Sequence, residues 1–236
     1  MTGLNILSGG AAQGLVGSLA PAFKAKTGLD IEGEFGAVGV MADKLRTGHP
    51  TDIVILTEAL VETLAAEKLV LPSSKRNVGT VETALAVRTD HPTVSAPDGD
   101  SLRKTLLAAD AIYVPDTRAS TAGIHVAKVL ELLGIAEAVE SRLKIYPNGA
   151  AAMRHLADSP AVRPIGCTQS TEIISTPGVM LSGALPPGSE LATVYTAAIT
   201  AGAIRPHEAK VLIDILTAPD HRQLRAAAGF LEPPQN

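Results

Sequence analysis

Short apolar runs alternate with longer stretches in which apolar residues recur every three or four positions along most of the chain. Residues 52–56 contain the continuous run Ile-Val-Ile-Leu, which is typical of a strand buried on both faces of a sheet. This alternation of strands and helices predicts an α/β fold with a largely parallel sheet. The expected strands are residues 4–7, 31–35, 52–56, 83–88, 111–114, 143–146, 163–167, 179–181 and 193–199, and the expected helices are residues 12–26, 40–47, 58–67, 101–109, 122–133, 150–157, 170–174, 207–217 and 221–228.

The first expected helix, residues 12–26, carries both a stop signal and an interruption. Leu15, Leu19 and Phe23 fall on one helical face, and Gly28 is placed to end the helix. Pro21 lies in the middle and has no backbone N–H to donate. We therefore expect the helix to kink or break at Pro21.

Composition and charge narrow the class of protein. Of the 236 residues, 46% are hydrophobic but only 3% are aromatic, and Trp is absent, so bases would find no stacking platform. The net charge of −4 and the scattered basic residues give no case for nucleic acid. No apolar run is long enough to insert into a membrane. Neither Gly-rich nucleotide-binding motif occurs, and we expect no cofactor.

The residues that most often carry metals or thiol chemistry give weak signals here. Cys167 is the only cysteine, so it forms no disulfide within the chain, and we interpret it as a buried residue rather than a nucleophile. The six His residues lack metal-ligand spacing, so we expect no metal site. The first residues have no basic segment of a signal peptide. This predicts a cytoplasmic protein as the chain stands, or a periplasmic one if a leader has been removed.

Two stretches, residues 5–15 and 163–174, share a pattern that suits anion binding. In each, an apolar strand leads into a turn of small or polar residues and then into a helix. Such turns present backbone N–H groups at a helix N-terminus, where an anion is favoured. One turn near the start and one past the middle of the chain fit two lobes that face a common ligand.

The ordered set of segments resembles one known family. Residues 19–28 (LAPAFKAKTG), 50–56 (PTDIVIL), 122–128 (AGIHVAK) and 165–172 (IGCTQSTE), with 193–199 and 212–217, resemble the molybdate-binding-protein-like branch of the type II periplasmic solute-binding proteins. The resemblance implies two α/β lobes, each a mixed sheet flanked by helices, with the ligand cleft between them. Lobe one would be residues 1–83 and 193–236, and lobe two residues 84–192, with crossings near residue 83 and between 174 and 195.

The resemblance also implies which turns contact the ligand. The positions of the ligand-binding residues in molybdate binders fall on Ala11, Val38 or Gly39, Ala122, Gly149 and Gln169. Several of these have lost the hydroxyl group that a tetrahedral oxyanion needs, and each unmet bond costs about 1–3 kcal/mol. The remaining candidates for ligand contact are Ser8, Gly10, Arg118, Ser120, Thr121, Thr168 and Ser170. Ser120 or Thr121 is equally well interpreted as a helix N-cap.

Arg118 changes the expected ligand class. A guanidinium grips a carboxylate with two parallel hydrogen bonds, so a small organic acid is favoured over molybdate. If the protein is exported, the expected partner besides the small anion is an ABC transporter permease.

Two other functions stay open. The branch also includes proteins similar to aconitate isomerase, which shifts a proton between allylic carbons of a tricarboxylate and needs anion clamps and one general base. Glu172, Asp116 and His155 are candidates for that base, but none stands out, so the catalytic residues are unknown. The third possibility is a ligand-sensing domain that acts through a partner.

Overall fold

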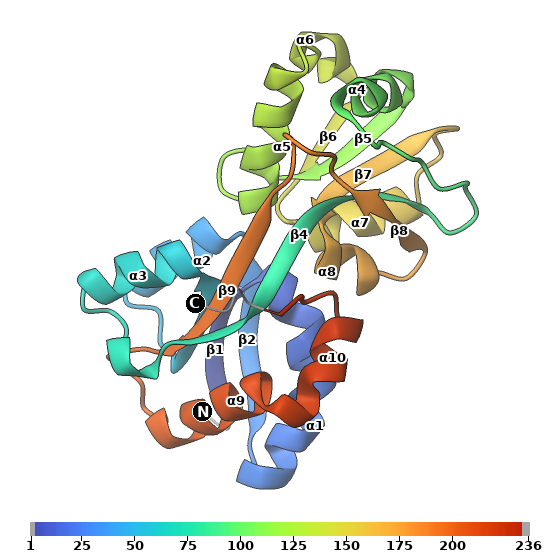
Figure 1. Cartoon of the computed structure of the whole chain (residues 1–236). Coiled ribbons are helices and arrows are strands. Elements are labelled where there is room, and N and C mark those ends of the chain that lie inside the picture. Colours follow the sequence, from blue (N-terminus) through green and yellow to red (C-terminus); the bar gives the residue numbers. More distant parts are fainter. Residues whose placement is uncertain (1–2, 233–236) are drawn as a thin grey trace. The chain divides into compact units, whose positions relative to one another are not determined.

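The computed structural model describes residues 3–232, and these divide into two compact units. Unit 1 holds the described residues up to Val81 and from Thr193 onward, and unit 2 holds residues 82–192. The chain therefore leaves unit 1 once and returns to it once. Each unit is an α/β assembly with its own sheet and helices (Figure 1).

The sheet of unit 1 has the order β2-β1-β3-β9-β4. Strand β1 lies parallel to both β2 and β3, whereas β9 is antiparallel to β3, so the sheet is mixed. The strands are β1 (Gly3–Gly9), β2 (Asp30–Gly36), β3 (Ile53–Thr57), β9 (Ala192–Ile199) and β4 (Arg76–Arg88). Strand β4 continues into unit 2, so all nine strands form one hydrogen-bonded series through it.

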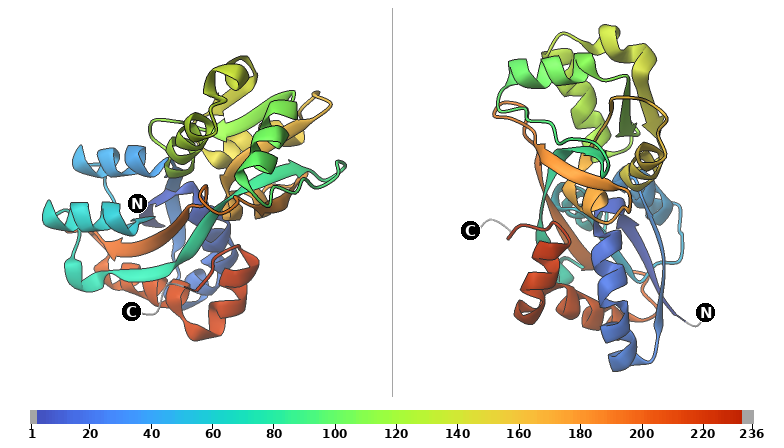
Figure 2. Two further views of the ribbon diagram at one scale, coloured as in Figure 1. Left: turned by 45° about the horizontal axis from the view of Figure 1, so that its top comes forward. Right: turned by 90° about the vertical axis from the view of Figure 1, so that its right-hand side faces the viewer.

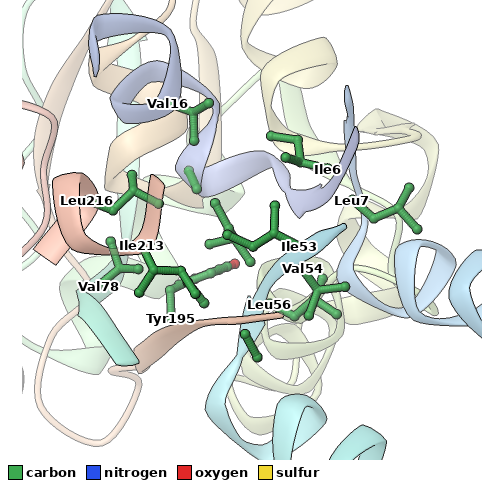
Figure 3. Close-up of a cluster of buried hydrophobic side chains, with 14 of the residues drawn as sticks. Ile6, Leu7, Val16, Ile53, Val54, Leu56, Val78, Tyr195, Ile213 and Leu216 are labelled. Atoms are coloured by element: carbon green, nitrogen blue, oxygen red, sulfur yellow. The ribbon is translucent and has the colours of Figure 1, made fainter. Parts of the chain in front are cut away.

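Helices cover both faces of this sheet, with α1, α9 and α10 on one side and α2 and α3 on the other (Figure 1). They are α1 (Gln13–Thr27), α2 (Val38–Arg46), α3 (Glu58–Ala66), α9 (Pro206–Thr217) and α10 (Arg222–Ala227), with the short 3₁₀ turns η1 (Gly10–Ala12), η2 (Pro72–Ser74) and η4 (Pro219–His221). Apolar side chains from strands and helices form a single core, part of which is drawn in Figure 3.

Pro21 was expected to kink or break the first helix, and the break does not occur, because α1 runs through Pro21 as one helix. Pro21 has no N–H to donate to the carbonyl of Gly17, one turn earlier. Both residues are exposed, so this carbonyl faces water. Leu15, Leu19 and Phe23 are fully buried on the opposite face and hold the helix against the core. Gly28 ends the helix in the left-handed conformation, with φ of 73°, as expected.

Unit 2 is built on the strand order β4-β7-β5-β6, with β8 also paired to β4. Strand β5 is parallel to β6 and β7, and β4 is antiparallel to β7 and β8. The strands are β5 (Ala111–Pro115), β6 (Leu143–Tyr146), β7 (Pro164–Gln169) and β8 (Val179–Ala184).

Side chains of successive residues on these strands pack alternately into two separate cores, one on each face of the sheet. On β5, Ile112 and Val114 join one core and Ala111 and Tyr113 the other, as the period of two in a strand requires. Helices α4 (Gly99–Ala108), α5 (Thr121–Leu132) and α6 (Ala136–Val139) cover the first core, and α7 (Gly149–Ala157) and α8 (Ser170–Ile174) cover the second (Figure 2). The turn η3 (Glu140–Arg142) precedes β6.

Among residues 3–232, none of the helices is both long enough and apolar enough to cross a bilayer.

Candidate functional site

In unit 1, two turns of the expected site lie side by side at one edge of the sheet. They follow β1 and β2, which are parallel and place Gly9 opposite Gly36 at their carboxyl ends. The turns touch, because a methyl group at Gly9 would come within 2.8 Å of Val38 Cγ1. Ligands of open α/β sheets bind at such carboxyl edges. The structure therefore brings together Ser8, Gly10, Ala11, Val38 and Gly39.

The side chains of these unit-1 turns offer little to an anion. Ser8 is fully buried and donates its hydroxyl proton to the carbonyl of Gly9 at 2.9 Å. Ala11 and Val38 are buried and apolar. The residue at the N-cap of α2 is Ala37, which has no side-chain acceptor for the first helical N–H groups. The donors that this edge can present are therefore backbone N–H groups.

In unit 2, three turns meet at one edge of the sheet. They follow β5, β6 and β7, and β5 is parallel to both of its neighbours. Helix α5 begins directly against the first turn, because a methyl group at Gly123 would come within 2.1 Å of the Asp116 carbonyl oxygen. Glycine at 123 is thus required for this close approach.

The turn between β5 and α5 combines a rigid loop with an available cation. Asp116 Oδ1 accepts hydrogen bonds from the N–H groups of Arg118 and Ala119, at 2.7 and 2.9 Å, which fixes the loop as an Asx-type turn. The guanidinium of Arg118 is exposed and makes no hydrogen bond or ion pair within residues 3–232.

Helix α5 begins at Thr121, with Ser120 at the N-cap position. Ser120 therefore occupies the N-cap position that the sequence predicted. Its side chain, however, makes no capping hydrogen bond. The first N–H groups of α5, which include those of Thr121 and Ala122, therefore lack a side-chain acceptor from the cap residue. A cation and uncapped helical N–H groups thus occur in the same turn.

The turn between β6 and α7 differs, because side chains of the protein occupy the N-terminus of the helix that follows. Asn148 Oδ1 accepts from the N–H of Ala151 at 2.8 Å. The carboxyl group of Glu172 lies against the start of α7, because a methyl group at Gly149 would come within 1.9 Å of Glu172 Oε2. Side chains of unit 2 therefore already occupy the N-terminus of α7.

Glu172 joins this turn to the next one. Its Oε2 accepts from the Thr168 hydroxyl at 2.6 Å. Burial raises the pKa of the Glu172 carboxyl, while the Thr168 hydroxyl and the nearby backbone N–H groups act in the opposite direction. Thr168, Gln169 and Ser170, the expected ligand residues of the β7–α8 turn, are all buried.

The residues considered for catalysis have structural partners. Asp116 holds its own loop, as described above. The His155 ring stacks on Tyr146 with centroids 4.2 Å apart. Cys167 is buried, as expected, and burial raises the pKa of its thiol to about 12. No group of three His, Cys, Asp or Glu suited to a metal ion occurs in residues 3–232.

Sequence reasoning considered Glu172 only as a base and missed its place between two turns. The available signal was weak: Thr168 and Glu172 are four residues apart, but nothing in the sequence links them to Gly149. Asn148 was expected only as part of a ligand turn, and its role as the N-cap of α7 was missed, although Asn directly before a helix is a standard capping signal.

The two α/β units, each with helix-led turns at the carboxyl edge of its strands, define a periplasmic-binding-protein fold. The chain belongs to the family described as bacterial extracellular solute-binding protein, whose model matches residues 4–231. This agrees with the resemblance to the molybdate-binder-like branch.

Solved structures with this fold include binders of inorganic anions. The periplasmic molybdate-binding protein of Azotobacter vinelandii has a TM-score of 0.82 with 19% identity, over 98% of this chain and 100% of that one. The sulfate-binding protein SubI of Mycobacterium tuberculosis has a TM-score of 0.76 with 17% identity, over 98% and 86%.

A curated relative is an enzyme. Aconitate isomerase from a Pseudomonas species is 25% identical over 231 residues, covering 93% of this chain and 84% of that protein. Another structural neighbour, PEB3 with bound L-phospholactate, has a TM-score of 0.69 with 15% identity, over 97% of this chain and 99% of that one.

Proposed function

We propose that this solute-binding protein captures a small organic acid and binds it more tightly than molybdate. The observation that carries the proposal is the exposed Arg118 guanidinium beside the uncapped start of α5. A planar guanidinium matches a carboxylate with two parallel hydrogen bonds, and helical N–H groups add a favourable dipole.

The composition of the unit-1 turns supports the same ligand class. Ala11 and Val38 offer no hydroxyl, and the Ser8 hydroxyl proton is already donated to a carbonyl. An oxyanion that needs donors over its whole surface loses about 1–3 kcal/mol for each missing bond. An organic acid presents an apolar carbon skeleton to these same side chains and loses nothing there.

The proposed ligand contacts come from both units, which close on the ligand as the family resemblance implies. Unit 1 contributes Gly10, Ala11, Val38 and Gly39 through the backbone. Unit 2 contributes the charged and hydroxyl-bearing residues. The full proposed set is Ser8, Gly10, Ala11, Val38, Gly39, Arg118, Ser120, Thr121, Ala122, Gly149, Thr168, Gln169 and Ser170.

If the protein is exported, its role is delivery of the bound acid to an ABC transporter permease. One structural neighbour is the substrate-binding domain of a molybdenum ABC transporter from Clostridium difficile, with a TM-score of 0.68 and 15% identity over 98% of this chain and 99% of that one. That likeness supports the fold, and the transport role of this chain is part of the proposal.

Calorimetric titration tests the ligand class directly. We expect saturable binding of an organic acid from a panel of aconitates, citrate and phospholactate, and weaker binding of molybdate and sulfate. Arg118→Ala should weaken the binding of the organic acid by about 2–5 kcal/mol, as for loss of a desolvated charge pair. The affinity of Arg118→Lys should lie between those of the wild type and Arg118→Ala, because Lys keeps the positive charge but cannot form two parallel hydrogen bonds.

Arg154→Ala is the matched control, since Arg154 is also exposed on unit 2 but lies on α7. It should bind like the wild type. Tight molybdate binding, or an Arg118→Ala variant that binds organic acids as the wild type does, would show that the proposal is wrong.

A second candidate function is isomerisation of a tricarboxylate, favoured by the similarity to aconitate isomerase over 93% of this chain. Proton NMR of cis-aconitate incubated with the protein would reveal the trans isomer if turnover occurs. Binding without any growth of trans signals over the buffer blank would leave capture as the function. No general base is assigned, because Asp116 and Glu172 are both engaged in hydrogen bonds within unit 2.

A further inference from the structure

We infer that Glu172 is the positioning residue of the unit-2 turns, with its carboxylate acting as a built-in anion that fills the N-terminus of α7. The inference rests on the proposed function only where it assigns these turns to ligand binding. Its structural part stands on the contacts of Glu172 alone.

The carboxyl group of Glu172 touches two turns at once. Its Oε2 accepts a hydrogen bond from the Thr168 hydroxyl at the end of β7, at 2.6 Å. The same oxygen lies so close to the start of α7 that a methyl group at Gly149 would come within 1.9 Å of it. Glu172 thus fixes the β6–α7 turn relative to the β7–α8 turn.

The carboxyl group leaves no room for a side chain at position 149. A methyl group at Gly149 would lie 1.9 Å from Glu172 Oε2 and 2.2 Å from Thr168 Oγ1. Only glycine at 149 therefore admits the carboxylate to the helix N-terminus. Gly149 and Glu172 therefore form a pair, because the position of the Glu172 carboxyl group requires that residue 149 has no side chain.

This pairing determines which turn of unit 2 can receive a ligand anion. The N-terminus of α7 already holds the Asn148 cap and the Glu172 carboxyl group. Ser120 at the N-cap of α5 makes no capping hydrogen bond, and the Asp116 carboxylate of that turn accepts from Arg118 and Ala119, ahead of the helix. A second anion at α7 would find the start of the helix occupied by Glu172. Glu172 therefore directs the ligand carboxylate to the α5 turn and Arg118.

Glu172→Ala tests the built-in anion by chemical rescue. The substitution removes the CH2–COO⁻ group, which acetate replaces almost atom for atom. We expect acetate to raise the Tm of Glu172→Ala saturably, above the effect of chloride at equal ionic strength, because a ligand that binds the native state stabilises it. The wild type and the exposed control Glu131→Ala should respond to acetate as they do to chloride.

Acetate rescue distinguishes a site that specifically holds a carboxylate from a general packing role of the Glu172 side chain. If Glu172→Ala can be obtained only unfolded, recovery of folded protein on refolding in acetate but not in chloride supports the inference. Equal responses to acetate and chloride, in either assay, would overturn it. Neither assay uses the physiological ligand, so a failure of the proposed function leaves this test unaffected.

A double variant tests the match between the two residues. Gly149→Ala should lower the Tm markedly in the wild type, because its methyl group collides with the carboxylate. In the Glu172→Ala background the same substitution should cost less, since the collision with the Glu172 carboxyl group is gone and only that with Thr168 Oγ1 remains. Equal losses of Tm in the two backgrounds would show that Gly149 and Glu172 are not paired as inferred.

Discussion

The ring of Tyr195 lies against the α-carbon of Gly9, so closely that a methyl group at Gly9 would come within 2.8 Å of Tyr195 Cε1. Tyr195 lies on β9 and is almost completely buried, with its ring edge-on to Phe230 at 6.4 Å between centroids (Figure 3 shows Tyr195 in the core). Gly9 ends β1 directly before the candidate turn. Packing therefore requires a small residue there, independently of any ligand.

Gly9→Ala should destabilise unit 1 by about 1–3 kcal/mol, the usual cost of overpacking a core. The new methyl group would also meet Val38 Cγ1 at 2.8 Å, and both neighbours are buried in the core of unit 1. Urea denaturation measures the loss.

The matched control is Gly17→Ala on the exposed face of α1, where an added methyl group meets nothing within 4 Å. It should stabilise by about 0.5–1 kcal/mol, since alanine is favoured over glycine in a helix. A Gly9→Ala variant as stable as the wild type would contradict the described packing of Tyr195.

The elements of this fold are largely predictable from the sequence because they depend on local pattern. The apolar run of β3 and the glycine at position 28 each signal their role without help from distant residues. Pro21 shows where local signals fail. Its cost to α1 is offset by burial of the opposite face against helices and strands far away in the sequence, and a helical pattern alone does not reveal that.

In the candidate site, too, some features could be predicted from local sequence and others could not. The turns after the strands were predictable, because carboxyl ends of parallel strands share one edge. The roles of individual residues were not. Gly149 appears in the sequence as a turn residue open to a ligand, yet the carboxyl group of Glu172 lies against it. That contact joins residues 23 positions apart (172 − 149), so it requires the folded arrangement of β6, β7 and α7.

Asp52 is a second buried carboxylate with a structural role, and its loss should be costly. Oδ2 accepts from the Asn5 N–H at 2.9 Å, and Oδ1 accepts from the N–H groups of Ile204 and Arg205 at 2.8 and 2.9 Å. It thereby ties the starts of β1 and β3 to the start of α9. Hydrogen bonds to a charged group contribute about 1.5–3 kcal/mol each, so Asp52→Ala should lose at least about 2–3 kcal/mol.

Chemical denaturation of Asp52→Ala and Asp52→Asn measures this effect. Asn keeps the size but turns an NH2 group toward a backbone N–H, so we expect an intermediate loss. The control is Asp214→Asn on α9, which breaks only an exposed pair with Lys210 and should cost less than about 1 kcal/mol. Similar small losses for the Asp52 and Asp214 variants would refute the structural role of Asp52.

The pH dependence of Asp90 follows from its exposed contacts with Arg88 and His91. The Arg88 guanidinium donates two hydrogen bonds to the carboxylate, at 2.9 and 2.5 Å, and His91 Nδ1 lies 2.9 Å from Oδ1. The Arg88 hydrogen bonds, with the smaller contribution of His91, lower the pKa of Asp90 to about 2. Because the folded pKa lies below the unfolded value of about 3.9, the group binds fewer protons when folded.

The Asp90 contribution to stability should therefore be present above about pH 4 and disappear as the pH falls through about 2. NMR titration of the Asp90 side-chain carbon should give a midpoint near 2, and Arg88→Gln should move it upward, with His91 preventing a full return to the ordinary value. In Asp90→Asn, the part of the acid-induced loss of stability between pH 4 and 2 that comes from this carboxyl should vanish. A wild-type midpoint close to 3.9, unchanged by Arg88→Gln, would show that the bidentate contact does not form in solution.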